Sequence, residues 1–304
     1  MAERFSCARE SWDLDEPLLG TASQVLRWIV VEQPGTWGAD ALRQSDLPLE
    51  VADELARRCR RWRARPLLIR RCGGHDEGVR RVFVASSVPG AAWVRRFVLD
   101  DAAEVLDLDL ASLAEDEPVD GEPVDGPLLL TCTNGRHDAC CAEYGRGVAA
   151  VLDEPFEGRA WECSHIGGDR FAANLLCLPE GVYYGRVTPA AAVGIAHLHE
   201  AGGLSLPHFR GRSAWPFDVQ AAETLLRLRL GVDGIDDVRP LRVRRPESGT
   251  VDVELAVADQ RWRVELEVAP DPQPQQLTCS ATRPGHPPRY TLREMVALPV
   301  QADA

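Results

Sequence analysis

Side chains that bind metals gather in two short stretches in the middle of this 304-residue chain. The first stretch contains Cys132, Cys140 and Cys141, and the second contains Cys163 and His165. Thiolates and imidazoles are preferred ligands of iron, zinc and copper. Five of the nine cysteines lie in this middle region. In a reducing compartment, such a group is typical of a metal-binding or redox-active site rather than of disulfides.

Four kinds of site fit these residues. Iron–sulfur clusters take thiolates, and imidazole can replace two of them on one iron. Structural zinc also binds Cys and His, although the sequence contains no Cys-x₂-Cys pair. The third alternative is a metal-free protein-interaction module. The fourth is a thiol oxidoreductase, which would need a reactive thiol at Cys140 or Cys141.

The other cysteines and histidines are expected to have different roles. Alternation along its strand points Cys177 into the core. His197 and His199 are two residues apart on an expected helix and face different ways, so they do not form a metal pair. His137 lies inside the first cysteine stretch, where it is expected to donate a hydrogen bond to a ligand. The cysteines that are scattered along the chain and expected to be structural are Cys7, Cys59, Cys72 and Cys279.

Both donor stretches follow expected strands. Loops held at strand ends by a rigid scaffold are where metal ligands usually lie. Gly135, Gly167 and Gly168 would let the backbone approach a bulky cluster. The elements expected within residues 127–204 are a strand at 127–132, a helix at 141–152, a strand at 159–164, a hairpin at 171–178 and 182–187, and a helix at 189–200.

A similar order of elements is expected in residues 1–112. Hydrophobic periodicity predicts a strand at 25–32, a helix at 51–62, and strands at 66–70, 81–86 and 92–99. The two orders suggest structurally similar halves, of which the first lacks the cysteine cluster. After the second half, residues 205–304 are expected to form an α+β appendage of unknown role. Its expected elements are a helix at 216–230 and strands at 238–243, 251–257, 262–268 and 277–283.

An acidic segment separates the two halves. Residues 100–125 contain eleven carboxylates and no basic residue. We interpret residues 113–126 as an exposed acidic linker. The linker is either a solvated connector or a docking surface for a basic redox partner, since complementary charge speeds encounter.

Composition and charge argue against two classes of partner. The chain is 45% hydrophobic and 27% charged, which is ordinary for a globular protein of about two domains. Its net charge of −13 argues against nucleic-acid binding. No apolar run reaches the roughly 18–20 residues that a membrane span needs, and the first residues do not resemble a signal peptide. We therefore expect a cytoplasmic protein that binds neither nucleic acid nor membrane.

The donor stretches resemble the sucrase/ferredoxin-like family, a branch of the thioredoxin-like ferredoxins. The resemblance implies an α/β fold in which a thioredoxin-like ferredoxin domain binds a [2Fe–2S] cluster. It also suggests that the first half is a second thioredoxin-like unit without a cluster. The similar segments are 68–71, 132–141, 161–174, 184–187 and 210–213.

The family resemblance implies four ligands, two cysteines and two histidines in a His-x₃-His motif. Cys132 and Cys141 match the cysteines, and His165 matches the first histidine. The second histidine falls on Asp169, where this sequence departs from the pattern. Because carboxylate is a hard ligand, Cys163 is the first candidate for the fourth position and Asp169 is the second. A site that binds no cluster is the remaining alternative.

The family name also mentions a sucrase. Glycoside hydrolysis needs two carboxylates about 5–10 Å apart across a sugar site, and no such pair stands out in the sequence, so we do not predict sucrose hydrolysis. We expect a [2Fe–2S] electron-transfer protein with a redox or iron-related role and an unidentified protein redox partner.

Overall fold

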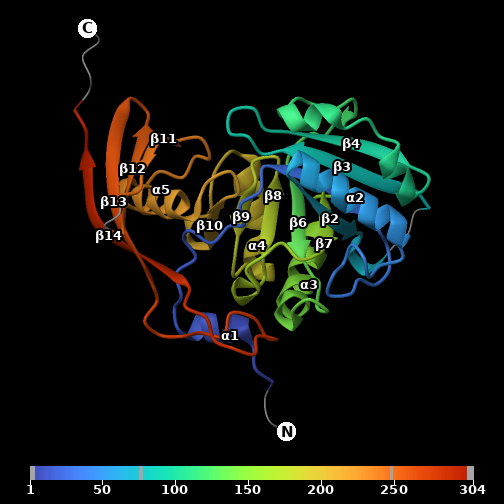
Figure 1. Cartoon of the computed structure of the whole chain (residues 1–304), viewed down its shortest axis with the longest axis horizontal. Coiled ribbons are helices and arrows are strands. Elements are labelled where there is room, and N and C mark those ends of the chain that lie inside the picture. Colours follow the sequence, from blue (N-terminus) through green and yellow to red (C-terminus); the bar gives the residue numbers. More distant parts are fainter. Residues whose placement is uncertain (1–3, 75–77, 247–248, 300–304) are drawn as a thin grey trace.

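The chain folds around two sheets (Figure 1). The structure is a computed structural model, and it describes residues 4–74, 78–246 and 249–299. One sheet has ten strands in the order β10-β9-β8-β6-β7-β2-β1-β3-β4-β5, and the other has four in the order β11-β12-β13-β14. No helix among the described residues combines the length and the apolar character that crossing a membrane requires.

The first half of the large sheet is built from four strands and one helix. β1 pairs in parallel with β2 and antiparallel with β3, and β3 pairs antiparallel with β4. The parallel pair requires a crossover, which α2 provides. The elements are β1 (Arg27–Glu32), α2 (Leu49–Trp62), β2 (Ala64–Arg70), β3 (Arg80–Ser86) and β4 (Trp93–Leu99).

The second half repeats this arrangement. β6 pairs in parallel with β7 and antiparallel with β8, and β8 pairs antiparallel with β9. α3 is the crossover here, and α4 follows β9. The elements are β6 (Leu128–Cys132), α3 (Ala139–Asp153), β7 (Ala160–Cys163), β8 (Leu175–Leu178), β9 (Val182–Tyr184) and α4 (Pro189–Glu200). The two halves therefore share one strand order and one set of strand directions.

The halves join edge to edge and also pack face to face. β2 and β7 pair antiparallel over two positions, Ile69 with Cys163 and Arg70 with Glu162. Across the bend at this junction, the rings of Trp28 on β1 and Tyr183 on β9 are 6.5 Å apart. In a flat sheet, five strand spacings would separate these strands by about 24 Å. The sheet is therefore folded back on itself around a shared apolar core.

Helices cover the outer faces of both halves. α2 packs on β1, β2 and β3 of the first half. α3 and α4 pack on β6, β8 and β9 of the second half. The inner faces need no helix because each half covers the other.

The acidic segment is partly packed. Leu113 and Val119 are buried against the first half, and β5 (Glu122–Pro123) adds to the edge of the large sheet beside β4. The carboxylate of Asp116 accepts a hydrogen bond of 2.7 Å from Arg27. Residues 113–126 are thus held on the sheet by apolar side chains and by two ion pairs, Arg27–Asp116 and Arg96–Glu122, and they are less exposed than a free linker. One 3₁₀ helix, η2 (Ala102–Leu106), precedes this stretch, and a second, η3 (Ala111–Glu115), overlaps its start.

The last part of the chain begins in the large sheet and then leaves it. β10 (Phe209–Arg212) pairs with β9, so the change of architecture lies after residue 212 rather than at residue 205. α5 then packs on the four-stranded sheet. These elements are α5 (Phe217–Leu230), β11 (Val238–Arg244), β12 (Thr250–Val257), β13 (Gln260–Pro270) and β14 (Pro288–Ala297).

The strand expected at 277–283 is wrong. Those residues lie in the connection between β13 and β14, and the last strand is β14. The N–H of Cys279 donates 2.7 Å to the Asp138 carboxylate instead of to a neighbouring strand. This connection returns to the first helix, α1 (Cys7–Asp13), at the bottom of Figure 1.

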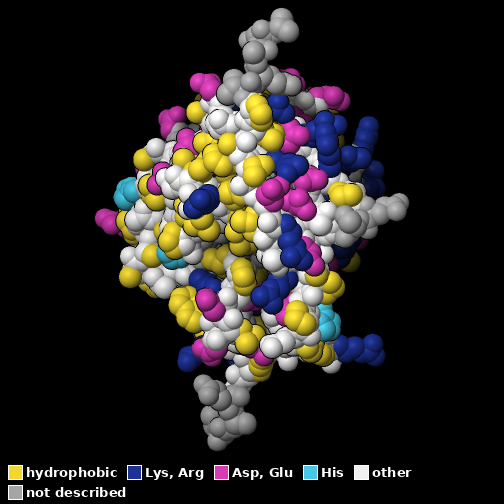
Figure 2. Space-filling view, turned by 90° about the vertical axis from the view of Figure 1, so that its left-hand side faces the viewer, with side chains coloured by type: hydrophobic (Ala, Val, Ile, Leu, Met, Phe, Trp, Pro, Cys, Tyr) yellow, Lys and Arg dark blue, Asp and Glu magenta, His cyan; other side chains and the backbone are white. Residues whose placement is uncertain are grey.

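The outer side of the four-stranded sheet has a mixed surface. Figure 2 views the molecule from this side and shows hydrophobic side chains down the middle, with basic and acidic side chains beside them. Arg263–Glu294 and Arg293–Glu267 pair β13 with its edge neighbour β14. Charges along an edge strand oppose pairing with other chains.

The shared core predicts that the two halves unfold together. Phe83 is fully buried on β3, and its ring lies 5.8 Å from that of Trp161 on β7. We expect Phe83→Ala to lower the free energy of unfolding by about 3–5 kcal/mol, the cost of a large cavity. Phe217→Ala, at a ring that is 41% exposed, should cost less than about 1 kcal/mol. Urea denaturation followed by circular dichroism measures both, and two separate transitions in the wild type would contradict the shared core.

Candidate metal centre

The two donor loops meet because two parallel strands end side by side. Cys132 and Cys163 are register partners at the ends of β6 and β7. Parallel strands place their carboxyl ends at the same edge of a sheet, so the loops that follow start next to each other. Helix α3 packs closely against the end of β6, since a Cβ at Gly145 would overlap the carbonyl oxygen of Cys132. This close approach places Cys141, in the first turn of α3, over Cys132.

Three of the expected donors come together. The sulfurs of Cys132 and Cys141 and a ring nitrogen of His165 all lie within 4.8 Å of one another. Both cysteines are 1% exposed, whereas 19% of the His165 side chain is exposed. The group therefore has a buried sulfur side and a histidine side that reaches the surface.

Asp169 and His137 adjoin His165. One carboxylate oxygen of Asp169 lies 3.3 Å from the Cys141 sulfur and 2.9 Å from Nδ1 of His165. Although Nδ1 of His165 lies at ion-pair distance from Asp169, it is buried and forms no hydrogen bond with any described residue. The ring of His137 stacks on that of His165 at 3.7 Å, and its Nδ1 lies 3.2 Å from the carbonyl oxygen of Ala39.

Cys163 lies apart from this group. It is fully buried, and among the described residues its sulfur is not within 4.8 Å of all three donors. β7 ends at Cys163, and Ser164 turns toward β2, with its N–H donating to Leu68 and its Oγ accepting from Leu68. The alternation of side chains along a strand was expected to put Cys163 and His165 on one face. Because the strand ends at Cys163, this alternation does not extend to His165. By the same measure Asp169 also lies outside the three-donor group, but its carboxylate contacts two of the three members, Cys141 and His165.

The group is strongly polarised in the absence of a metal. Burial opposes charge on His165, but the Asp169 carboxylate and the Cys132 sulfur outweigh it and raise the His165 pKa to about 9. Hydrogen bonding from Cys141, and to a smaller extent from His165, lowers the Cys132 pKa well below its usual value. A thiolate and an imidazolium are thus stable together, and a bound cation would take the place of the imidazolium proton.

A buried arginine fixes the loop that carries Asp169. Arg210, on β10, is 1% exposed and donates to the Gly167 carbonyl oxygen at 3.0 Å and to Oδ1 of Asn174 at 2.7 Å. The amide of Asn174 donates 2.8 Å to the Gly168 carbonyl oxygen. Gly168 has φ +81°, and a Cβ there would overlap the Arg210 guanidinium. Separately, Arg65 donates 2.7 Å to the backbone oxygen of His165.

These residues fit a metal or a metal cluster. Two buried thiols and one imidazole are soft or borderline donors, and the His165 ring has a buried nitrogen that lacks a hydrogen bond. Metal ligands are usually oriented by further hydrogen bonds, and the arginine framework supplies them to the loop backbone. The donor types fit either zinc or iron. The positions of three donors do not distinguish between the two metals.

A second group of donors was not expected from the sequence. Cys7 and Cys279, both predicted to be scattered structural cysteines, meet Cys140 and Asp138. Contacts with Cys7 and with Ser6 lower the pKa of Cys140 to about 6. Spacing along the chain could not reveal this group, since 133 and 139 residues separate its cysteines from Cys140. The adjacent Cys140 and Cys141 are the one sign of a second group in the sequence. Successive helical residues point about 100° apart, so two adjacent cysteines on a helix cannot both face the same site.

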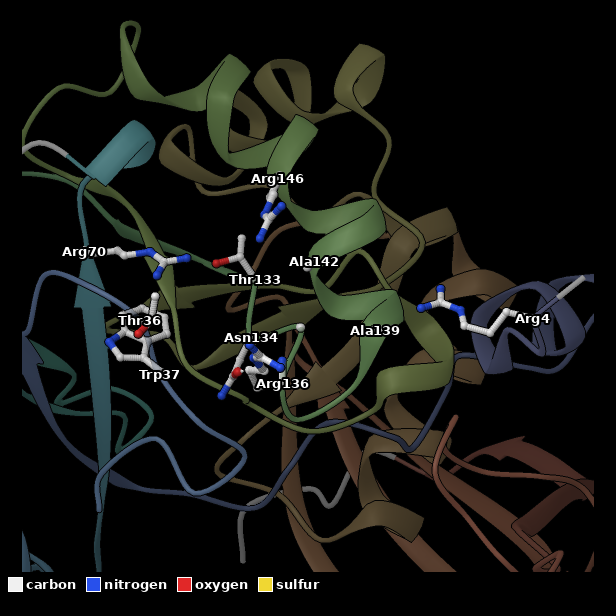
Figure 3. A pocket seen from close by; sticks show the side chains of 11 residues that line it. Arg4, Thr36, Trp37, Arg70, Thr133, Asn134, Arg136, Ala139, Ala142 and Arg146 are labelled. Carbon is white, nitrogen blue, oxygen red and sulfur yellow. Dashed lines mark hydrogen bonds between the residues drawn. The ribbon is translucent and has the colours of Figure 1, made fainter. Parts of the chain in front are cut away.

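A basic pocket lies beside the first cysteine loop. It has a volume of about 480 Å³, and Figure 3 shows Arg70, Arg136 and Arg146 around it, with Arg4 at the other side of α3. Arg70 pairs with Glu162 at 2.7 Å. Neither Arg136 nor Arg146 forms an ion pair with any residue in the described ranges. A locally basic surface thus adjoins the metal centre of an acidic chain.

One of the comparisons with known proteins found a family whose model spans this site. The family model described as sucrase/ferredoxin-like matches residues 18–211, which include Cys132, Cys141, His165 and Asp169. No curated protein and no solved structure matches the chain significantly. The matched region covers both halves of the large sheet and ends inside β10. This chain therefore belongs to the sucrase/ferredoxin-like family.

Proposed function

We propose that this protein binds a [2Fe–2S] cluster through Cys132, Cys141, His165 and Asp169 and transfers electrons to a protein partner. The observation that carries the proposal is the buried grouping of two thiols and one imidazole at adjoining strand ends in a chain of the sucrase/ferredoxin-like family. A cluster of this kind supplies reversible one-electron chemistry when bound. The arrangement of strands supports a thioredoxin-like fold. Each half has two parallel strands joined by a helix, and two antiparallel strands lie beside the first of them.

Asp169 is the proposed fourth donor. It occupies the position where the family pattern has a second histidine, and it lies within 2.9 Å of His165 and 3.3 Å of Cys141. His137 then acts as a support, since it stacks on His165 and is itself oriented by the Ala39 carbonyl oxygen. The carboxylate adds negative charge where the family pattern has a neutral imidazole.

The surface around the site supports an acidic docking partner. The acidic segment 113–126 lies at the β4–β5 edge, five strand positions from β7 in the order of the large sheet. The pocket with Arg136 and Arg146 adjoins the cysteine loop directly. Charge complementarity near the redox group speeds productive encounter, so we favour an acidic partner at this pocket over a basic partner at the acidic segment.

The expected compartment and partners stay part of the proposal. All nine cysteines are free, which supports a reducing compartment such as the cytoplasm. The net charge of −13 argues against nucleic acid as a partner. A structural zinc ion at the same three donors is the alternative function, because zinc accepts the same ligand types.

The cluster predicts a specific pattern of variants. The anaerobically purified chain should be brown, and reduction with dithionite should bleach it and produce an electron paramagnetic resonance signal. Cys132→Ser and Cys141→Ser should abolish both signals, since each removes a thiolate. Cys163→Ser should retain both, because its sulfur lies outside the group, and Cys177→Ser is the matched control for loss of a buried thiol. A colourless wild type with one zinc per chain would support the zinc alternative instead.

Asp169 can be tested by restoring the family pattern. Asp169→His replaces an anionic ligand by a neutral one, so the reduction potential should rise by on the order of 100 mV. A redox titration followed by electron paramagnetic resonance measures the shift. If Asp169→His leaves the potential unchanged and His137→Ala shifts it, the fourth ligand is His137 and the assignment of Asp169 is wrong.

The basic pocket can be tested with small redox probes of opposite charge. Arg136→Glu should slow oxidation of the reduced protein by ferricyanide about 10-fold at low salt and speed oxidation by a cationic cobalt complex. Arg229→Glu makes the same charge change on the exposed end of α5 and should affect neither rate. Equal effects of the two substitutions in stopped-flow experiments would mean that net charge alone, and not this pocket, governs encounter.

A further inference from the structure

The second group of donors lies at the place where three distant segments meet. Cys7 begins α1, Cys140 lies in the first turn of α3, and Cys279 lies in the connection between β13 and β14. In Figure 1, α1 and this connection run side by side below the large sheet. Cys7 and Cys279 are 272 residues apart in sequence, so their contact joins α1 to the connection between β13 and β14.

The sulfurs form a nearly regular triangle. The distances are 3.8 Å between Cys7 and Cys140, 3.4 Å between Cys140 and Cys279, and 3.6 Å between Cys279 and Cys7. A tetrahedral zinc ion with Zn–S bonds of 2.3 Å separates its sulfur ligands by about 3.8 Å. The triangle therefore has the size of one face of a zinc–thiolate tetrahedron. A disulfide would instead bring one pair to about 2.05 Å and leave the third thiol alone.

Asp138 occupies the fourth corner. Both of its carboxylate oxygens lie 3.7 Å from the Cys7 sulfur. They also accept hydrogen bonds from the backbone N–H groups of Cys140 at 2.9 Å and Cys279 at 2.7 Å. The carboxylate thus fixes the backbone at two of the three cysteines and is itself 3% exposed. Carboxylate oxygen is an accepted zinc ligand.

We propose that Cys7, Cys140 and Cys279, with Asp138 as the fourth ligand, bind one zinc ion that fastens α1 and the connection between β13 and β14 to helix α3. Three thiolates favour zinc over hard cations such as magnesium and calcium. Four protein ligands leave no open position, as in structural rather than catalytic zinc sites.

Apolar packing is slight where these segments meet, although Arg186 donates hydrogen bonds to Ser11 of α1. α1 has seven residues, which is too short to be a stable helix alone. The apolar cluster around it is small, with Cys7, Ala8, Cys140 and Ala172 as its buried members. Within residues 271–287, the connection forms a single isolated bridge, Gln275 with Gly285. A metal ion that joins three segments would add the missing restraint, and its binding free energy would contribute directly to folding.

The zinc site is separate from the proposed cluster site. Cys140 and Cys141 are adjacent on α3 but point in different directions, toward α1 and toward Cys132. Cys7 and Cys279 lie outside residues 18–211, the part that matches the family. The second site is thus a property of this chain beyond the family's shared region, and it does not depend on the proposed electron transfer.

Metal analysis of the anaerobically purified full chain tests the proposal. The wild type should contain about one zinc ion per chain in addition to any iron. Cys279→Ser should lose the zinc and keep the iron and the visible spectrum, whereas Cys132→Ser should lose the iron and keep the zinc. Cys72→Ser removes another half-buried cysteine and should keep both metals. Equal zinc in the wild type and Cys279→Ser would overturn the proposal, as would a wild type that takes up no zinc from zinc chloride.

A second measurement covers the case in which Cys279→Ser does not fold. Removal of zinc from the wild type with a chelator should speed hydrogen exchange in α1 and in residues 271–287, and zinc chloride should reverse the change. α4, which does not touch this group, should exchange at the same rate throughout. Unchanged exchange in both segments after loss of zinc, or a disulfide between Cys7 and Cys140 in zinc-free protein, would contradict the fastening role.

Discussion

The parallel pairing of β6 and β7 is the constraint on which the metal centre depends. Because Cys132 and Cys163 are register partners at the strand ends, the loops after them begin about one strand spacing apart. α3 must cross from one strand to the other, and Gly145 lets it approach the Cys132 carbonyl. Cys141 and His165 are then brought to Cys132 by the backbone itself. A shift of this register by one residue would turn these side chains to the opposite face of the sheet.

The folded-back sheet explains why one half can support a site in the other. β2 and β7 pair over two positions only, yet the inner faces share a core that includes Phe83 and Trp161. Arg65, from β2 of the first half, holds the backbone of His165. The first half therefore has no cysteine cluster of its own, but it covers and positions the cluster loops of the second half. This arrangement accounts for a family match that spans both halves.

Much of the fold could be predicted from local pattern. Alternating and apolar runs located the strands of the large sheet except β5 and β10, and helical periodicity located α2, α3, α4 and α5, because burial on one face determines both patterns. Local pattern could not predict the fold of the sheet onto itself, which depends on contacts such as Trp28 with Tyr183. It also failed at residues 277–283, where the Cys279 N–H is satisfied by a distant carboxylate instead of by a strand.

Part of the candidate metal site could also be predicted from the sequence. Cys132 and His165 come together because each lies at or just after a strand end, and Cys141 joins them because it lies in the first turn of the helix that follows β6. Cys163 was ranked above Asp169 by strand alternation, but the strand ends at Cys163. The stacking of His137 on His165 and the meeting of Cys7 with Cys279 arise from tertiary contacts between segments with no shared pattern. Such contacts leave no mark in a single sequence.

In the proposed function, the strand-end donors hold two bridged irons. Analysis of iron and acid-labile sulfide in the anaerobically purified chain tests this proposal most directly. We expect about two of each per chain, both lost together when Cys132 is replaced by serine. A chain that contains no sulfide and retains its metal after that replacement would contradict it.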